Sequence, residues 1–301
     1  MASEMVFRPD VVLSGPGGSR AILEISALKR LFEEENFMDN VKIWAGVSAG
    51  AAISLLIVCG YTPTEIEEIC SGVTILDDVL SINLDEAAKN LGLVKLKGIE
   101  AKLSQVVSAK FGFIPTLKQL YVLTGLELSV VAFNVDKMEP AFLDKNTAPD
   151  LSCVESVMMS ISIPILFQPR KYNGDVFIDG AVGACYPISH YDNGENHVLG
   201  MYISSDEEYI NLENNPMKYI YRLIHCSMKV LRDMEIKYAS DKVKHIILKT
   251  SFTDTTGLTM DKQTRDNLLR AGYIAADNFL KINKNPEKYS FSLEESQEIP
   301  F

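Results

Sequence analysis

The Gly-x-Ser-x-Gly pattern at residues 46–50 constrains the fold of this chain more than any other stretch. The apolar residues 41–45 before it predict a strand, and the apolar run that follows predicts a buried helix ending at Gly60. A serine at a sharp turn between a strand and a helix has the geometry of a nucleophile elbow. The two glycines lack a Cβ, so the strand and the helix can approach closely beside a strained Ser48.

A second glycine-rich turn comes earlier, at residues 14–20 (Ser-Gly-Pro-Gly-Gly-Ser-Arg), between a strand at 11–13 and a helix that begins at Ile22. Such a turn presents backbone N–H groups to an anion. A phosphate-binding P-loop needs Lys and then Ser or Thr after its last glycine, and a dinucleotide fingerprint needs glycine where Arg20 stands. Two interpretations remain, which are an oxyanion-binding loop and a plain tight turn.

Composition excludes several classes of protein. The chain has 301 residues, 47% of them hydrophobic, and a net charge of −11, which argues against a nucleic-acid partner. The longest apolar run, at residues 49–59, is too short to span a bilayer, and residues 1–10 lack the apolar core of a secretory signal. The odd, scattered cysteines predict reduced thiols in a cytoplasmic protein, without a metal site: Cys59, Cys70, Cys153, Cys185 and Cys226.

The remaining chain alternates between strands and helices. Further strands are predicted at 126–133, 141–143, 197–203 and 244–249, and helices at 63–70, 84–91, 99–111, 117–123, 152–159, 216–239 and 261–282. Asn173-Gly174 predicts a hairpin that delivers Asp179-Gly180 at the end of its second strand. We therefore expect one domain over residues 1–282, an α/β fold with a mostly parallel central sheet flanked by helices, and a polar acidic tail at 283–301.

A serine hydroxyl needs a base before it can act as a nucleophile. His190, in a loop after the hairpin, is the one histidine placed for a triad, because the other three lie within or at the start of predicted elements. Asp179 is better placed, because it ends a strand and sites in such folds gather at strand ends. Taken alone, Asp179 is as well explained as a turn residue, but beside Ser48 and the glycine-rich loop it becomes the preferred base.

These motifs together resemble those of the patatin-like phospholipase family. The resemblance rests on residues 13–20, residues 46–50, the segment 160–164 and residues 179–181, in this order. It implies a three-layer α/β/α fold, Ser48 as the nucleophile and Asp179 as the base of a catalytic dyad. The loop that contains Gly15, Gly17, Gly18 and Arg20 would then form the oxyanion hole. Pro16 interrupts the glycine run and has no N–H, so Gly17 and Gly18 are the expected donors.

The family resemblance also implies what the protein acts on. It predicts a lipid acyl hydrolase of the phospholipase A or lysophospholipase type that cleaves carboxylic esters through an acyl-enzyme, with no metal, calcium or organic cofactor. The partner would be a lipid substrate at a membrane or micelle surface, with no nucleic acid and no transmembrane segment. Head group, acyl position and oligomeric state stay open, and the expected location is the cytoplasm, with peripheral contact to membranes.

Three other functions compete with this interpretation. One is a Ser-Asp-His esterase of the α/β-hydrolase kind with His190 as the base, although that fold usually places its elbow after several strands. Another is a non-catalytic lipid-binding or storage protein with the same fold, against which the intact Ser48 and Asp179 argue. The third, a nucleotide-dependent oxidoreductase, is disfavoured by Arg20.

Overall fold

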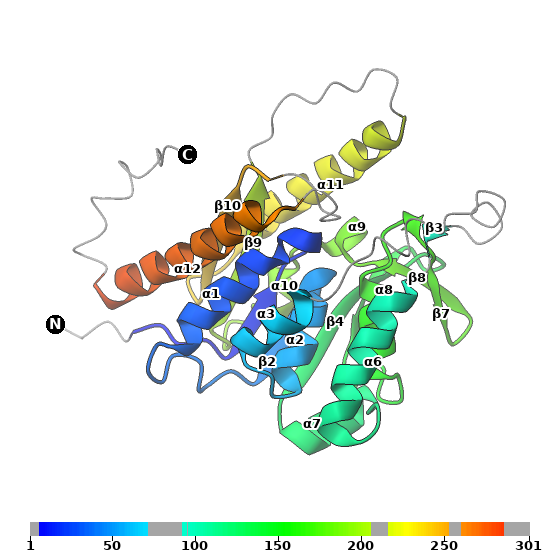
Figure 1. Ribbon diagram of the computed structural model, residues 1–301, viewed down its shortest axis with the longest axis horizontal. Coiled ribbons are helices and arrows are strands. Elements are labelled where there is room, and N and C mark those ends of the chain that lie inside the picture. The colour runs from blue at the N-terminus through cyan, green and yellow to red at the C-terminus, as the bar shows by residue number, and fades with distance from the viewer. Residues whose placement is uncertain (1–5, 72–91, 95, 206–215, 253–259, 286–301) are drawn as a thin grey trace.

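Strands and helices alternate along the chain, as the sequence predicts (Figure 1). The computed structural model describes residues 6–71, 92–94, 96–205, 216–252 and 260–285. The strands in these residues are β1 (Val11–Ser14), β2 (Ile43–Val47), β3 (Gly92–Val94), β4 (Glu127–Asn134), β5 (Glu139–Leu143), β6 (Ile165–Phe167), β7 (Arg170–Tyr172), β8 (Asp175–Asp179), β9 (Val198–Ser205) and β10 (Val243–Thr250). The helices are η1 (Gly18–Ala21), α1 (Ile22–Phe32), α2 (Ala49–Val58), α3 (Pro63–Ser71), α6 (Lys97–Phe111), α7 (Leu117–Thr124), α8 (Cys153–Ser160), α9 (Ala181–Ala184), α10 (Ile188–Tyr191), α11 (Pro216–Tyr238) and α12 (Lys262–Lys284).

Two predicted segments lie outside the described residues. They are the short helix at 84–91 and, beyond residue 285, most of the acidic tail.

The central sheet is mostly parallel. Strands β10, β9, β1, β2 and β4 follow one another in this order and run in the same direction. Strands β5 and β8 both pair with β4 in the antiparallel sense, and β7 extends the hairpin beyond β8. Within the described residues β3 and β6 form a separate two-stranded sheet. The expected fold class is therefore confirmed.

Helices cover both faces of this sheet and complete three layers (Figure 1). On one face, α1, α2, α3, α6, α7, α8 and α12 enclose the larger apolar cluster, which includes Val12 and Trp44. On the other face, α9, α10 and α11 pack against a smaller cluster that contains Leu13 and Ala45. Neighbouring residues of one strand thus belong to opposite faces, as the alternation of side chains along a strand requires.

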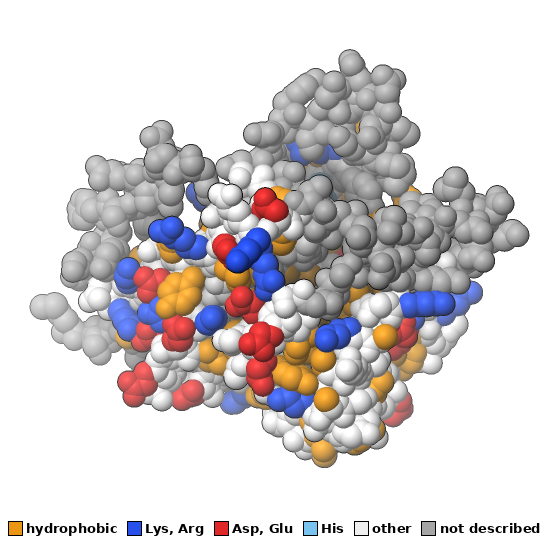
Figure 2. All heavy atoms as spheres, in the orientation of Figure 1, with side chains coloured by type: hydrophobic (Ala, Val, Ile, Leu, Met, Phe, Trp, Pro, Cys, Tyr) orange, Lys and Arg blue, Asp and Glu red, His pale blue; other side chains and the backbone are white. Residues whose placement is uncertain are grey.

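The outer helices α1 and α12 pack closely against each other. A Cβ at Gly272 would lie 2.1 Å from the Leu23 carbonyl oxygen, so the glycine is what lets the two backbones approach. Charged side chains of both signs intermingle on this side of the molecule (Figure 2). Arg30 bonds Asp277 at 2.8 Å, and Lys281 bonds the same carboxylate at 2.7 Å. This helix pair therefore shows no continuous basic surface of the kind that binds nucleic acid.

Candidate active site

Ser48 lies at the turn between β2 and α2, where the sequence predicts an elbow. Its backbone has φ +55° and ψ −126°, a strained conformation for a residue with a side chain. A Cβ at Gly46 would lie 2.4 Å from the Gly50 carbonyl oxygen, and one at Gly50 would lie 2.3 Å from the Ser14 carbonyl oxygen. Both glycines are thus needed for the close packing of β2, α2 and the end of β1.

The pairing of β4 explains how Ser48 and Asp179 meet. Strand β5 pairs with residues 130–134 of β4. Two of these residues, Val130 and Val131, also pair with β2, and Ala132 also pairs with β8. Because a strand residue has one neighbour on each side, β2 and β8 must both lie on the side of β4 opposite β5. Strand β2 ends beside Val131 and β8 ends with Asp179 beside Ala132. The carboxyl ends of β2 and β8 therefore meet head-on, which places Asp179 next to Ser48.

The carboxyl group of Asp179 is fixed by backbone contacts. The backbone N–H of Asp179 donates to the Ser162 carbonyl at 2.9 Å, and the Ala181 N–H donates to the Asp179 Oδ1 at 2.9 Å. A Cβ on the following Gly180 would lie 2.3 Å from the Val131 carbonyl oxygen, so glycine allows the chain to turn against β4. The side chain of Ser48 lies close enough to Asp179 to stabilise its carboxylate. One hydroxyl and one carboxyl group thus lie side by side.

Burial gives Asp179 the basicity that a catalytic base needs. Only 2% of the residue is exposed, and this desolvation raises the pKa of its carboxyl group to about 7. The hydrogen bond from Ala181 and the nearby Ser48 side chain stabilise the carboxylate and hold the pKa below what burial alone would give. An aspartate with a pKa near neutrality can both accept and return a proton at cellular pH.

If this site hydrolyses esters, the rate should depend on pH through the ionisation of the Asp179 carboxyl group. If Asp179 is the base, only its deprotonated form is active, so kcat/KM is expected to rise with pH as a single ionisation near pH 7. Measuring kcat/KM for a soluble ester from pH 5 to pH 9 tests this expectation. A profile that is flat across this range, or one that falls as the pH rises through 7, would contradict it.

Ser160 anchors the elbow to the sheet. The Ser48 N–H donates to the Ser160 Oγ at 2.8 Å, and the Ser160 hydroxyl donates in turn to the Val131 carbonyl at 2.5 Å. In the sequence this residue stands out only as part of the family-like segment 160–164, with no role attached. The contact could not be found from the sequence, because it joins residues 112 positions apart.

The glycine-rich loop leaves two N–H groups for an anion. The Gly15 N–H donates to the Met201 carbonyl at 3.0 Å, so it continues the pairing of β1 with β9 and is not available to a ligand. The side chain of Arg20 folds back and its Nε donates to the Gly17 carbonyl at 3.3 Å. The N–H groups of Gly17 and Gly18 donate to no carbonyl within the described residues. Gly15 and Arg20 therefore shape the loop.

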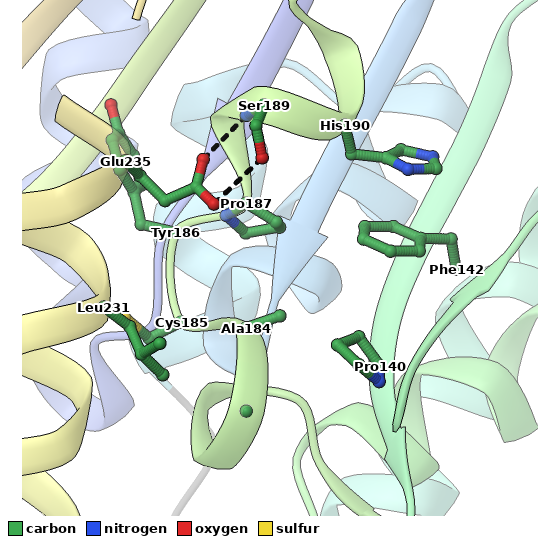
Figure 3. Close-up of a pocket in the computed structure, with 11 residues that line it drawn as sticks. Pro140, Phe142, Ala184, Cys185, Tyr186, Pro187, Ser189, His190, Leu231 and Glu235 are labelled. Atoms are coloured by element: carbon green, nitrogen blue, oxygen red, sulfur yellow. Dashed lines mark hydrogen bonds between the residues drawn. The ribbon is translucent and has the colours of Figure 1, made fainter. Parts of the chain in front are cut away.

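His190 lies in a different part of the molecule. Its ring stacks on Phe142 with centroids 3.5 Å apart, in a cavity of about 280 Å³ that residues of β5, α10, α11 and the chain around α9 line (Figure 3). Neither Ser48 nor Asp179 lines this cavity. The next residue, Tyr191, bonds Ser129 in the middle of the sheet. His190 is thus not brought to the elbow, which argues against the triad alternative.

Comparison with known proteins places the chain in a family. The family model described as patatin-like phospholipase matches residues 11–190, which include Ser48, Asp179 and the glycine-rich loop. The chain belongs to the patatin-like phospholipase family. A probable lipid hydrolase, 463L of Invertebrate iridescent virus 6, is 33% identical over 197 residues, or 62% of this chain and 65% of the relative. The match thus spans just under two thirds of that relative's length.

A bacterial relative and two solved structures extend the comparison. The uncharacterized protein YqhO of Bacillus subtilis is 26% identical over 293 residues, which cover 90% of this chain and 98% of that one. VipD from Legionella pneumophila superposes with a TM-score of 0.58 at 16% identity, over 92% of this chain and 67% of VipD. The type III effector protein ExoU gives a TM-score of 0.50 at 13% identity, over 92% of this chain and 53% of ExoU. At such identities these structures establish the shared fold alone.

Proposed function

We propose that this patatin-like protein hydrolyses carboxylic ester bonds of lipids through a Ser48–Asp179 dyad. The observation that supports the proposal most is the contact between the Ser48 hydroxyl and a buried carboxyl group whose pKa is about 7. The family and the viral relative named as a probable lipid hydrolase support a lipid substrate. Glycerophospholipids, lysophospholipids and neutral acyl esters are the candidate classes.

The proposed reaction proceeds in two steps. Asp179 accepts the proton of the Ser48 hydroxyl while Ser48 attacks the ester carbonyl, and the Gly17 and Gly18 N–H groups stabilise the oxyanion. The tetrahedral intermediate collapses, the alcohol leaves with the proton held by Asp179, and an acyl-enzyme remains on Ser48. Asp179 then takes a proton from water, which attacks the acyl-enzyme. The second tetrahedral intermediate collapses as Asp179 returns this proton to the Ser48 oxygen, which releases the fatty acid and restores the hydroxyl.

The proposed reaction requires that a lipid ester reach the buried Ser48 hydroxyl. Ser48 is 5% exposed and Asp179 is 2% exposed, so a lipid reaches the hydroxyl only if the groups around it move apart. This cover keeps Asp179 out of water and its pKa high. Among the described helices, no stretch is long and apolar enough to cross a bilayer. From the family match we propose that the substrate is met at the surface of a membrane or micelle, from the cytoplasm.

A panel of labelled lipids tests the proposed function. Purified protein is incubated with a glycerophospholipid, a lysophospholipid, a triacylglycerol and a monoacylglycerol, each in mixed micelles, with and without a calcium chelator. We expect free fatty acid from at least one substrate and no effect of the chelator. Fatty acid release from none of the four, by protein that is folded in a thermal melt, would favour the non-catalytic lipid-binding alternative.

A further inference from the structure

Glu24 is a buried acid that the proposed reaction does not use. It lies in the first turn of α1, directly after η1, and the residue is fully buried, as is Ser14 at the end of β1. Glutamate is rarely buried in this way without a charged partner. The side chain therefore calls for a physical explanation.

The neighbours of its carboxyl group belong to the glycine-rich loop. Neither Glu24 oxygen forms a well-directed hydrogen bond within the described residues, and the same is true of the Ser14 Oγ. The groups close enough to stabilise the carboxylate are the Ser14 side chain and the Gly15 backbone. Burial outweighs both and raises the pKa of Glu24 well above its usual value, which favours the protonated, neutral form of the group.

The Glu24 side chain and α2 both lie beside the first two residues of the loop, Ser14 and Gly15. A Cβ at Gly50 would lie 2.3 Å from the Ser14 carbonyl oxygen and 2.6 Å from that of Gly15, so the elbow helix packs directly against this backbone. The Glu24 carboxyl group lies beside the same two residues, in the first turn of α1. Because Gly15 stands two positions before Gly17 in the same loop, we expect a displacement of Ser14 or Gly15 to shift the N–H groups of Gly17 and Gly18.

Tyr186, which follows α9, is a titratable group that interacts with Glu24, and this interaction contributes to raising the pKa of Tyr186 well above 10. The Tyr186 hydroxyl bonds the Nδ1 of His245, at a distance of 2.9 Å. Burial lowers the pKa of His245. These neighbours are therefore uncharged near neutral pH and offer no counter-ion for an ionised Glu24.

We propose that the buried carboxyl group of Glu24 is a positioning residue, which holds Ser14 and Gly15 and thereby aims the N–H groups of Gly17 and Gly18 at the oxyanion. The proposal rests on the proposed function. It differs from a purely structural role, because an unpaired buried acid lowers stability, and an apolar residue of similar size should fold at least as well. A residue kept for positioning lowers stability while it supports the reaction.

Two variants of Glu24 test the proposal. Glu24→Gln keeps the shape and an N–H donor without a charge, whereas Glu24→Leu keeps the approximate volume and has no donor. We expect Glu24→Gln to retain kcat within about threefold, and Glu24→Leu to lower kcat about 10- to 100-fold with KM within about twofold, because misaimed donors weaken oxyanion binding. The melting temperature of Glu24→Leu should equal or exceed that of the wild type.

A matched control comes from the same helix. Ser26 is also buried, and its hydroxyl donates to the Leu269 carbonyl at 2.5 Å on α12, on the side away from the loop. Ser26→Ala is expected to lower the melting temperature and leave kcat unchanged. If Glu24→Leu kept wild-type kcat, or if Glu24→Gln lost as much kcat as Glu24→Leu, Glu24 would not be a positioning residue.

Hydrogen–deuterium exchange separates this proposal from the proposed function. In Glu24→Leu the amides of residues 14–20 should exchange at least about tenfold faster than in the wild type, and in Glu24→Gln they should not. This readout needs no turnover, so it decides whether Glu24 holds the loop even if no lipid is hydrolysed. Unchanged exchange in Glu24→Leu would overturn the proposal, whereas a wild type that cleaves no lipid would overturn the proposed function alone.

Discussion

Replacing Ser48 with alanine is expected to lower kcat on the best lipid of the panel by about 10⁵-fold or more, to the limit of detection. Loss of the nucleophile removes the covalent path, and only binding and oxyanion stabilisation remain. Fatty acid release by wild type and Ser48→Ala at equal concentration measures the effect. The fold should be unaffected, because the Ser48 N–H still donates to the Ser160 Oγ in the variant.

A buried serine on α2, the helix that follows Ser48, provides the control. Ser54 donates to the Ala45 carbonyl at 2.9 Å, one turn beyond the elbow. Ser54→Ala is expected to lose about 1 kcal/mol of stability and to keep kcat within a fewfold of the wild type. If Ser48→Ala retained more than about 1% of the wild-type rate, another nucleophile would have to perform the reaction.

Replacing Asp179 with asparagine is expected to lower kcat by about 10³- to 10⁵-fold. Asparagine preserves the shape and can still accept from the Ala181 N–H, but it cannot take the proton of the Ser48 hydroxyl. The residual activity should lose its ionisation near pH 7. Rates of the wild type and the variant from pH 5 to pH 9 measure both effects in one experiment.

Asp179→Asn is expected to lower activity without lowering the stability of the fold at high pH. Its folded-state pKa of about 7 is above the unfolded value of about 3.9, so the folded protein binds more protons between these values and stability falls as the pH rises. Asparagine carries no such penalty, so at pH 8 Asp179→Asn should melt no earlier than the wild type. Asp175→Asn, at the half-buried start of β8 where the carboxylate pairs with Lys137, is the matched control and should keep kcat. Near-full activity of Asp179→Asn would refute the dyad.

Local patterns in the sequence predicted most of the elements. Asn173 and Gly174 both have positive φ, as the hairpin signal requires, and Thr62 and Glu65 form a capping box before α3. Each of these depends on residues that are close in the sequence. The strand before the elbow is shifted, because β2 begins at Ile43 and continues to Val47, two residues later than the apolar pattern suggested.

Features that depend on distant residues could not be predicted. The sequence placed Asp179 at the end of a hairpin strand, but it could not show that β8 is antiparallel to β4 and meets β2 end to end. On α12 the apolar Ile274 is 39% exposed, whereas the buried row includes Gly272 and Ala276. The pattern of one helix cannot show which of its faces a neighbour will cover.

The contacts of buried polar residues could not be predicted from the sequence either. Glu24 falls within an amphipathic helix pattern, and Ser160 is one of many serines. Only the fold reveals that the first lies behind the glycine-rich loop and that the second bonds the elbow. Residues that support a reaction without taking part in it have no local sequence signal, since their partners lie on other elements.

Labelling with a fluorophosphonate tests the central claim most directly. The reagent mimics the ester carbonyl, and an activated serine attacks its phosphorus and displaces fluoride, which leaves a stable adduct that peptide mass mapping locates. We expect one adduct, on Ser48, with labelling at least about 100-fold slower in Asp179→Asn. Labelling of a different residue, or equal labelling of Ser48 in the wild type and Asp179→Asn, would contradict the account.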